Sequence, residues 1–455
     1  MNEADKKNLE EVAGRLDGME IQGVSIDSRN IRKGELFVAL KGDRFDGHDY
    51  VPDAIRKGAW GALVERSAFE TRYSSLGGLQ NIVPVEDTLY ALQEMALMHR
   101  KKFRIPLAGI TGSNGKTTTK EMLAGILKQT GPVLKNEGNL NNHIGVPITL
   151  LKLESRHRFA VVEMGMSALG EIETLARIAV PDVGVITNIG PAHLEFLGSM
   201  DGVAEAKGEL LENLRPDGTA VLNADDRYCG TLRKKFSGRV LTFGIDAASD
   251  VRATEMRQEQ EHTDFKLQAA GQTVSVRIRV PGRHNVYNAL AAAAAAIAMG
   301  MSVDAVKYGL DAFAPVAMRS EIKQIQGRIV LADYYNANPA SMEAALETLM
   351  SLTMGGRAIA VLGDMLELGD SSSEAHRELG RAVARLGVDL LITTGARAQD
   401  MARGAVEGGM PSDRVLELGT HAEIARALKT LTHSGDAVLI KGSRGMKMEK
   451  VLEEF

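Results

Sequence analysis

The sequence has 455 residues, of which 44% are hydrophobic and 25% are charged, and its formal net charge is −5. These values are ordinary for a globular protein that buries large cores, and roughly 150 residues per domain would give about three domains. Because no long basic block is present, we expect no nucleic-acid partner. The single cysteine, Cys229, excludes an intramolecular disulfide framework and fits a reducing cytoplasm.

The N-terminal stretch "MNEADKKNLEEVAGRL" is charged and helix-like, and it lacks the apolar core of a signal peptide. The most apolar run, "ALAAAAAAIAM" (289–299), is too short to span a bilayer and indicates a tightly packed core helix. We therefore expect a soluble, cytoplasmic protein that does not insert into membranes.

Three regions follow one another along the chain. Residues 1–102 alternate short strand-like runs ("GELFVAL", "GALVE") with helical ones, and the basic cluster from Arg100 to Arg104, followed by Pro106, indicates a linker. Residues 103–314 alternate apolar strands ("PLAGIT", "RFAVVEM", "DVGVITNI", "GTAVLNA") with amphipathic helices, which predicts a largely parallel sheet. Within this region, residues 239–281 lack helical periodicity and indicate antiparallel strands.

Residues 315–455 begin a second alternation, with strands at "RIVLADYY", "RAIAVLGDM", "DLLITTG" and "DAVLIKG". This pattern predicts another open α/β sheet. Ligands of such sheets bind beyond the carboxyl ends of the strands, so the polar residues at those ends are the candidates for function.

The segment "GITGSNGKTTT" (109–119) lies between a predicted buried strand and an amphipathic helix that Gly131 closes. It resembles a phosphate-binding loop, although Gly109 stands one residue earlier than the common spacing requires. The loop amides can face a phosphate at the helix N-terminus, Lys116 can reach the β- and γ-phosphates, and Thr117 can bind Mg²⁺. The alternative is a glycine-rich turn with a solvated lysine. The predicted nucleotide ligands are Gly112, Ser113, Asn114, Gly115, Lys116, Thr117 and Thr118.

Three further side chains are candidates for the chemistry of this site. Glu163 ends the buried strand "FAVVEM", where Mg²⁺ would account for a carboxylate, and the alternative is a surface residue that caps the next turn. His193 lies in the loop "NIGPAHLEFLG" and can bind a metal or phosphate, or be a plain loop histidine. Lys207 in "GVAEAKGELLENL" is, by its local pattern alone, a solvated helical lysine.

The segments "GITGSNGKTTT", "EMGM", "NIGPAHLEFLGS" and "EAKGELLENL", in this order, resemble the Mur ligases. These are ATP-dependent amide-forming ligases of peptidoglycan precursor synthesis, and their loop has the same shifted glycine pattern. The resemblance extends over the whole chain. It implies an α/β protein of three domains: a UDP-substrate domain (1–102), a central ATPase domain with a mostly parallel sheet plus a small antiparallel sheet (103–314), and a Rossmann-like ligase domain (315–455).

Three passages are most similar to the branch of the family that joins D-alanyl-D-alanine to UDP-N-acetylmuramoyl-tripeptide: "NEGNLNNHIGVPITLL" (136–151), "DYYNANPASMEAAL" (333–346) and "VLGDMLELGDSSSEAH" (361–376). The alternatives within the family are the tripeptide-forming ligase and a folate polyglutamate ligase. An alternative of another class is a phosphate-loop ATPase or a nucleotide-binding regulator. The third peptide residue is either lysine or diaminopimelate, and we expect a monomer.

The resemblance also assigns the residues around ATP. It implies that Mg²⁺ is held at Thr117, Glu163 and His193, and that Lys207 is carbamylated and becomes an anionic metal ligand. It implies that Lys116, His193, Lys207 and Arg319 serve catalysis, with Arg319 reaching the phosphates only when the third domain closes about hinges near 103 and 315.

Asn285 and Asn288, which open the helix "RHNVYNALAAAAA", are predicted to bind the adenine edge, and the alternative is helix capping. Asp333 and Asn336 match family residues that face the nucleotide and the second substrate. The family form Asp-Ser-Tyr-Asn is "DYYN" here, so Tyr334 stands where the family has serine.

The substrate side of the site is assigned from the same resemblance. The UDP end of the substrate is predicted to contact Ser28, Arg29 and Arg44, together with Asp46 and His48. Asn139 and Asn142 are predicted to contact the peptide. Lys441, Ser443 and Arg444 follow the last strand and are either site residues or a solvated turn.

Overall fold

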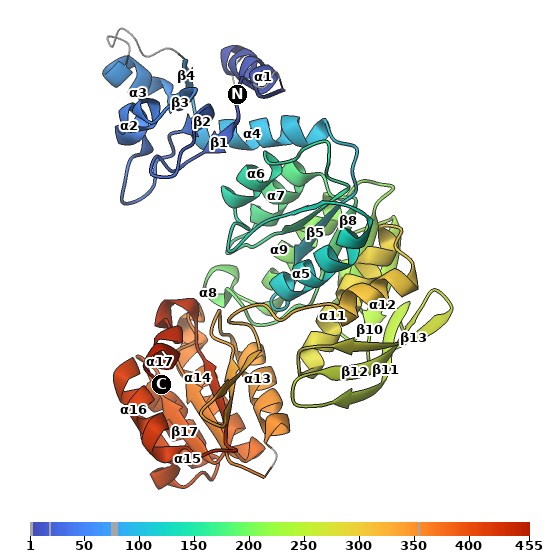
Figure 1. The fold of residues 1–455 in the computed structure, drawn as a ribbon, viewed down its shortest axis with the longest axis vertical. Helices are drawn as coiled ribbons and strands as arrows, with labels where there is room; N and C mark the ends of the chain where they lie inside the picture. Colours follow the sequence, from blue (N-terminus) through green and yellow to red (C-terminus); the bar gives the residue numbers. More distant parts are fainter. Residues whose placement is uncertain (1–2, 18–19, 74–80, 354) are drawn as a thin grey trace.

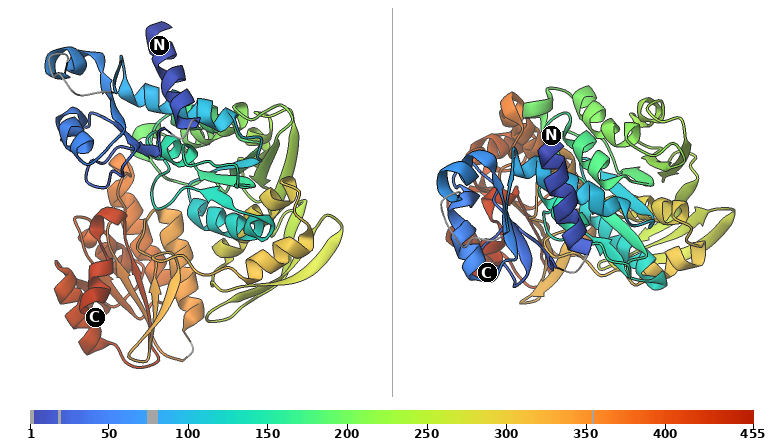
Figure 2. Two further views of the ribbon diagram at one scale, coloured as in Figure 1. Left: turned by 45° about the horizontal axis from the view of Figure 1, so that its top comes forward. Right: turned by 90° about the horizontal axis from the view of Figure 1, so that it is seen from above.

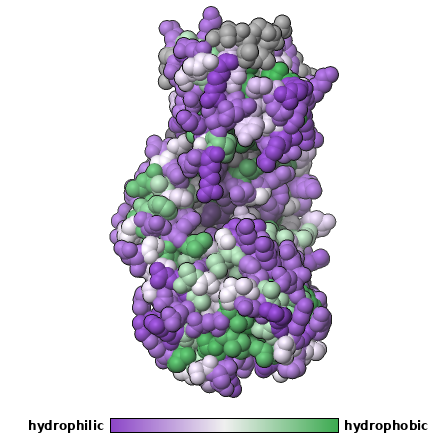
Figure 3. Space-filling model, turned by 90° about the vertical axis from the view of Figure 1, so that its left-hand side faces the viewer, coloured by the Kyte–Doolittle hydropathy of each residue, from purple (hydrophilic) through white to green (hydrophobic). Residues whose placement is uncertain are grey.

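The computed structural model describes residues 3–17, 20–73, 81–353 and 355–455 and shows an elongated molecule built around three sheets (Figure 1). The N-terminal part lies at one end and the C-terminal part at the other, with the largest sheet between them (Figures 1 and 2). One face is hollowed about midway along its length, and hydrophilic side chains border the hollow (Figure 3). Within the described residues, no helix has the length and apolar character needed to cross a membrane.

The N-terminal sheet has four parallel strands in the order β1-β2-β3-β4. Leu36 and Leu63 pack on one face of this sheet and Phe37 and Val64 on the other, as expected for parallel strands covered on both sides. The strands are β1 (Gly23–Ser25), β2 (Glu35–Val38), β3 (Gly61–Glu65) and β4 (Ile82–Val85), and the helices are α1 (Glu3–Asp17), α2 (Val51–Arg56) and α3 (Arg66–Ala68).

Helix α4 (Thr88–Lys101) connects the N-terminal sheet to the central part (Figure 1). The Asp87 side chain accepts a hydrogen bond from the Tyr90 amide and caps the helix start. At the other end, the buried Arg100 guanidinium donates to the carbonyls of Ala179 (3.0 Å) and Ile105 (3.1 Å). The segment predicted as a linker is therefore anchored at its start by a buried cation, while residues 103–106 have no regular structure.

The central sheet has nine strands in the order β13-β12-β11-β10-β9-β8-β5-β7-β6. All neighbours from β11 to β6 pair in parallel, whereas β11, β12 and β13 pair antiparallel. Antiparallel strands are present within 239–281, as expected, but β10, which opens this range, pairs in parallel with both β9 and β11. The antiparallel strands extend the parallel sheet instead of standing apart from it. The strands are β5 (Leu107–Thr111), β6 (Val133–Lys135), β7 (Phe159–Glu163), β8 (Val183–Ile186), β9 (Thr219–Asn223), β10 (Arg239–Gly244), β11 (Val251–Gln258), β12 (Thr263–Ala269) and β13 (Gln272–Ile278).

The alanine-rich helix α11 (Arg283–Ala298) packs beside α5 (Lys116–Leu127), and residues 289–296 are all fully buried. Because alanine is small, the two helices approach closely, which confirms the predicted core helix. The other helices of this part are α6 (Gly145–Leu150), α7 (Glu171–Ala179), α8 (Leu194–Leu197), α9 (Met200–Glu212), α10 (Cys229–Arg233) and α12 (Val303–Asp311).

The C-terminal sheet has the order β14-β15-β19-β16-β17-β18 and is parallel except for β14, which pairs antiparallel with β15. The polar residues that follow β15 and end β19 line the same cleft as the loop after β5. The strands are β14 (Glu321–Ile325), β15 (Arg328–Ala332), β16 (Ala358–Leu362), β17 (Leu390–Thr393), β18 (Val415–Glu417) and β19 (Ala437–Lys441). The helices are α13 (Pro339–Leu352), α14 (Ser372–Leu386), α15 (Ala398–Glu407), α16 (His421–Leu431) and α17 (Glu449–Glu454).

Candidate active site

A cleft of about 590 Å³ lies between the central and C-terminal parts of the molecule. The loop after β5 and the start of α11 line it on the central side, and the loop after β15 and the last residue of β19 line it on the other. The predicted site residues that line it are Ser113, Asn114, Gly115, Lys116, Thr117, Thr118, Asn142, Glu163, His193, Asn285, Asn288, Arg319, Asp333, Asn336 and Lys441.

Two glycines allow the loop after β5 to turn into α5. Gly112 and Gly115 have φ values of 146° and 81°, which L-residues rarely adopt. A Cβ at Gly112 would collide with the Thr187 hydroxyl, and one at Gly115 would collide with the Asn288 side chain. The loop amides therefore lead into the N-terminus of α5, the geometry that favours an anion.

Lys116, the first residue of α5, is folded back on its own loop. Its Nζ donates to the carbonyls of Gly112 (2.7 Å) and Ser113 (3.3 Å). Burial lowers the pKa of Lys116, and the carboxylate of Glu163 opposes this shift. The lysine thus lies at the phosphate loop with carbonyl partners that a nucleotide phosphate could replace.

The loop is held from one side by the end of β8. Asn188 Oδ1 accepts from the Asn114 amide (3.0 Å), and the Ser113 hydroxyl exchanges hydrogen bonds with the backbone of Gly190 (2.8 Å). Asn188 was not among the predicted site residues. Its position directly after the strand "DVGVIT" was the available signal.

Glu163 is 3% exposed at the end of β7. Its carboxylate accepts from the Thr117 hydroxyl (2.7 Å) and from Asn141 Nδ2 (2.8 Å), and Lys120 Nζ lies 3.7 Å away. Burial raises the pKa of Glu163. The cations of Lys116, Lys120 and Arg319 outweigh burial and hold this pKa below its ordinary value. A charged carboxylate beside a hydroxyl is the type of oxygen ligand that Mg²⁺ prefers.

His193 stands at the start of α8 with a left-handed backbone (φ 56°). Its Nδ1 lies 2.7 Å from Oε2 of the Glu367 carboxylate, and Glu367 lies in the segment after β16 of the C-terminal part. Among the described residues, no three His, Cys, Asp or Glu side chains gather into a metal cluster. Bound Mg²⁺ would therefore need phosphate and water oxygens beside the protein ligands, as is common for this ion.

Lys207 lies on the buried side of α9 and is 1% exposed. Across the described part of the chain, its Nζ makes no hydrogen bond or ion pair. Burial, reinforced by the nearby Lys116 cation, lowers the pKa of Lys207 well below its ordinary value. The prediction from local pattern, a solvated lysine, is therefore wrong, because tertiary packing removes this amine from water.

The two asparagines at the start of α11 lie at the loop. Asn285 Nδ2 donates to the Pro281 carbonyl (2.7 Å), and Asn288 Nδ2 donates to Asn285 Oδ1 (3.2 Å). Gly282 occupies the N-cap position of α11, without a side-chain cap, so neither asparagine is the N-cap. Asn288 instead packs against Gly115 of the phosphate loop.

The C-terminal part contributes a group of charged residues. The Arg319 guanidinium stacks over the Tyr335 ring at 3.9 Å from its centroid. Lys441 Nζ pairs with Asp333 Oδ2 at 2.6 Å and donates to the Asn336 carbonyl (3.0 Å). Lys441, which the sequence left undecided, therefore lies in the cleft.

Other residues of this part have different surroundings. Ser443 is buried, and Arg444 is 53% exposed and pairs with Glu449. Tyr334, which replaces the family's serine, packs in a hydrophobic core. The next residue, Tyr335, lines the cleft. His284 also lines the cleft, with Nε2 3.2 Å from the Ser320 hydroxyl, and it was not predicted.

The residues predicted to hold the UDP end lie in the N-terminal part and do not line the cleft. Arg29 is exposed and pairs with Asp27, Arg44 is exposed, and the buried Ser28 accepts from Lys57 through its carbonyl (2.9 Å). Asp46 and His48 form a turn, in which the Asp46 side chain accepts from the His48 amide.

His48 is buried, its Nδ1 lies 2.6 Å from Asp46 Oδ1, and its Nε2 accepts from the Glu65 amide. Burial raises the pKa of Asp46, but hydrogen bonds from His48 and Arg72 outweigh it and hold this pKa at about 2. Asn142 Oδ1 accepts from the amides that open α6 and also lines the cleft, whereas Asn139 is exposed outside it.

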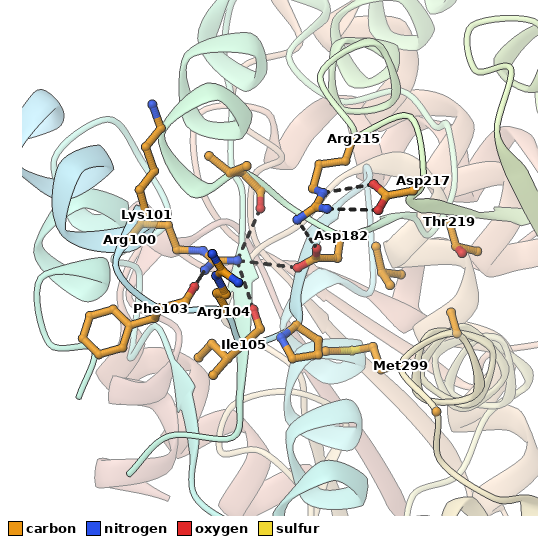
Figure 4. Close-up of a pocket in the computed structure, with 15 residues that line it drawn as sticks. Arg100, Lys101, Phe103, Arg104, Ile105, Asp182, Arg215, Asp217, Thr219 and Met299 are labelled. Atoms are coloured by element: carbon orange, nitrogen blue, oxygen red, sulfur yellow. Dashed lines mark hydrogen bonds and ion pairs between the residues drawn. The ribbon is translucent and has the colours of Figure 1, made fainter. Parts of the chain in front are cut away.

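A second cavity, of about 800 Å³, lies at the amino ends of β5, β8 and β9, away from the phosphate loop. Its central charges are already paired (Figure 4). Arg215 forms a two-point contact with Asp217, and Asp182 lies between Arg215 (3.4 Å) and Arg100 (3.5 Å). This network anchors the segment that links α4 to β5.

Comparisons with known proteins match three family descriptions to this chain. "Mur ligase family, catalytic domain" matches residues 20–100, "Mur ligase middle domain" matches 110–296, and "Mur ligase, glutamate ligase domain" matches 318–444. Among the relatives that bear the name UDP-N-acetylmuramoyl-tripeptide–D-alanyl-D-alanine ligase are proteins from Bacillus subtilis and Escherichia coli. The one from Bacillus subtilis is 38% identical (96% of this chain, 93% of the relative), and the one from Escherichia coli is 37% identical (96% and 95%).

Solved structures give a similar result. MurF from Acinetobacter baumannii superposes with a TM-score of 0.88 at 34% identity (97% of this chain, 98% of that one). MurF ligase from Thermotoga maritima in complex with ADP superposes with a TM-score of 0.84 at 30% identity (96% and 98%). These matches extend over all three sheets, in agreement with the predicted α/β fold of three parts.

Proposed function

Because the chain belongs to the Mur ligase family, we propose that it is an ATP-dependent ligase that joins D-alanyl-D-alanine to UDP-N-acetylmuramoyl-tripeptide. One observation carries this proposal: a phosphate loop and a C-terminal set of charged residues face each other across one cleft. The relatives from Bacillus subtilis and Escherichia coli, which align with this chain over nearly its full length, are named for that reaction. ATP is the expected nucleotide because a MurF ligase of the same fold was solved with ADP.

In the proposed first step, the terminal carboxylate of the tripeptide attacks the γ-phosphorus of ATP. The bond from that phosphorus to the bridging oxygen breaks, which releases ADP and leaves an acyl phosphate. Two anions must approach each other, so cations are needed to offset their repulsion. Lys116 on the loop and Arg319 from the C-terminal part would supply that charge.

In the second step, the amine of D-alanyl-D-alanine attacks the acyl carbon. The carbon–oxygen bond to phosphate breaks, phosphate leaves, and the nitrogen loses a proton, which gives the amide. The cleft between the two parts would keep water from the acyl phosphate. Closure about hinges near 103 and 315 remains a prediction, which small-angle scattering with and without ligands would check.

The residues at the loop fit a magnesium ion. Thr117 and Glu163 offer adjacent oxygens, and His193 offers a ring nitrogen in the lining of the same cleft. When bound, Mg²⁺ would neutralise charge on the β- and γ-phosphates. Thr117 and Glu163 would hold it together with the nucleotide, and the contact between His193 and Glu367 would fix the imidazole from the other side.

We also propose that Lys207 is carbamylated. Burial lowers the pKa of this amine well below its ordinary value, which favours its neutral form, and the neutral form is the nucleophile that adds to CO₂. The new nitrogen–carbon bond forms as the nitrogen loses a proton, and the product is a carbamate anion. Such an anion would be a partner for the Lys116 cation and for Mg²⁺.

The remaining assignments rest on the same family membership. Residues 1–102 would bind the UDP end, residues 103–314 would bind ATP, and residues 315–455 would close the site. Asn285 and Asn288 would contact adenine, while Asp333 and Asn336 would face the nucleotide and the dipeptide. The substrate contacts proposed are Ser28, Arg29, Arg44, Asp46, His48, Asn139 and Asn142.

The test is an assay of phosphate release with Mg-ATP and UDP-N-acetylmuramoyl-tripeptide, with and without D-alanyl-D-alanine, followed by mass spectrometry. We expect release that depends on the dipeptide and a UDP-N-acetylmuramoyl-pentapeptide product. Release without the dipeptide and without a new amide would indicate an ATPase. A product formed from UDP-muramoyl-dipeptide and a single amino acid would indicate another branch of the family.

A further inference from the structure

Helix α13 of the C-terminal part begins directly against the phosphate loop of the central part. Asn338, its N-cap, is 7% exposed. Its Nδ2 donates to Asn114 Oδ1 at 2.7 Å, and Asn114 Nδ2 donates to Asn338 Oδ1 at 3.3 Å. The two residues are 224 positions apart in the chain, so this amide pair joins two sheets through the loop that would hold the phosphates.

The direction of this pair is fixed by the helix cap. Asn338 Oδ1 accepts from the Ser341 amide at 2.9 Å, and the Ser341 hydroxyl accepts from the Asn338 amide at 3.0 Å. This capping box turns Oδ1 of Asn338 toward its own helix and leaves Nδ2 as the donor toward Asn114. The Oδ1 atom of Asn338 therefore accepts inside α13 and, at a longer distance, from Asn114, while its Nδ2 makes the shorter contact to Asn114.

Asn114 is held on its other side by the end of β8. Its amide donates to Asn188 Oδ1 (3.0 Å), and its carbonyl accepts from Asn188 Nδ2 (3.1 Å) and from the Thr187 hydroxyl. The backbone of Asn114 thus belongs to the central sheet, while its side chain contacts the C-terminal part. A change in the position of α13 must move or release that side chain.

We propose that Asn338 is a positioning residue that couples docking of the C-terminal part to the conformation of the phosphate loop. When α13 is docked, Asn338 fixes the Asn114 side chain and holds the loop between β8 and α13. Since coupling between two equilibria is reciprocal, nucleotide binding at the loop then favours the docked position of α13. The inference rests on the proposed function only in taking ATP as the ligand of the loop.

The alternative explanation is that Asn338 only caps α13. The two explanations can be separated because serine caps helices about as well as asparagine, and threonine caps them only slightly less well. Asn338→Ser keeps a cap acceptor and removes the amide that reaches Asn114. Asn338→Thr also keeps a cap acceptor and removes the same amide.

The experiment compares the full-length wild type with Asn338→Ser, Asn114→Ser and the double variant. Affinity for Mg-ADP is measured by calorimetry, kcat/KM for ATP is measured in the ligation assay, and Tm is measured for each protein. We expect Asn338→Ser to keep Tm within about 2 °C of wild type and to lower both ADP affinity and kcat/KM about tenfold. The double variant should lose no more than the larger single loss, since one pair is removed in each case.

Equal ADP affinity in Asn338→Ser and wild type would overturn the inference, and so would losses that multiply in the double variant. If Asn338→Ser lowers Tm further than expected, Asn338→Thr provides the same comparison, and unchanged ADP affinity in that variant would also overturn the inference. A wild type that binds ADP but forms no amide would refute the proposed function and leave the ADP comparison valid.

Discussion

Replacing Gly115 by alanine tests whether the phosphate loop and Asn288 form one binding surface. Gly115 is the N-cap of α5 with φ 81° and ψ −7°, and a Cβ there would overlap Asn288 Oδ1. An alanine in this left-handed conformation costs roughly 1–2 kcal/mol. Displacing Asn288 also breaks its hydrogen bond to Asn285, worth about 1 kcal/mol. We expect Gly115→Ala to lose about 2–3 kcal/mol of stability and to weaken Mg-ADP binding at least about tenfold.

The chain contains a matched control for this variant. Gly170 is the N-cap of α7 with φ 83° and ψ −12°, and a Cβ there meets nothing within 4 Å. Gly170→Ala therefore carries the same backbone strain without the collision, so it should lose about 1–2 kcal/mol in urea unfolding and bind ADP like wild type. If Gly115→Ala bound ADP as tightly as Gly170→Ala does, the account of the loop and Asn288 would be refuted.

The roles of Lys207, Lys441 and Asp46 can each be tested by substitution. Lys207→Ala should abolish ligation, and short-chain carboxylates such as acetate should restore part of the activity, since they replace the carbamate anion; an absence of rescue would count against the carbamate. Lys441→Met should lower the free energy of unfolding by about 3 kcal/mol, because it leaves the Asp333 carboxylate without its cation. Adding Asp333→Asn should recover most of that loss, as measured by urea unfolding. A further loss of stability in the double variant would contradict the pairing. The pKa of Asp46 falls from 3.8 unfolded to about 2 folded, so this carboxylate should contribute about 2 kcal/mol above pH ~4 and progressively less as the pH falls toward ~2. The stability difference between wild type and Asp46→Asn, followed against pH, checks this, and a difference that does not change across that range would contradict it.

Local sequence pattern predicted the α/β class and most of the strands, because these elements follow from their own residues, but it did not predict β14 or the continuation of the central sheet into β11–β13. The alanine run at 289–299 became the buried helix α11, and the loop at 109–119 became the turn between β5 and α5. Contacts between parts far apart in the chain could not be read in the same way. Asn338 before Pro339 is recognisable as a helix cap, but nothing local indicates that its amide reaches Asn114.

The position of Lys207 was open to a better interpretation. It follows Val203 by four residues and precedes Leu210 by three, and both are fully buried on α9. This spacing places the lysine on the apolar side of the helix, so periodicity argued against a solvated side chain. Lys441 remained undecided for another reason, since its partner Asp333 lies on a different strand.

The central claim is that the cleft activates a carboxylate as an acyl phosphate before the amide forms. It is tested most directly with UDP-N-acetylmuramoyl-tripeptide that carries ¹⁸O in its terminal carboxylate, incubated with Mg-ATP and D-alanyl-D-alanine. Mass spectrometry of the released phosphate then follows the label. The account predicts one ¹⁸O atom in each phosphate released and one retained in the new amide carbonyl. Phosphate without label, whether or not ATP is consumed, would contradict it.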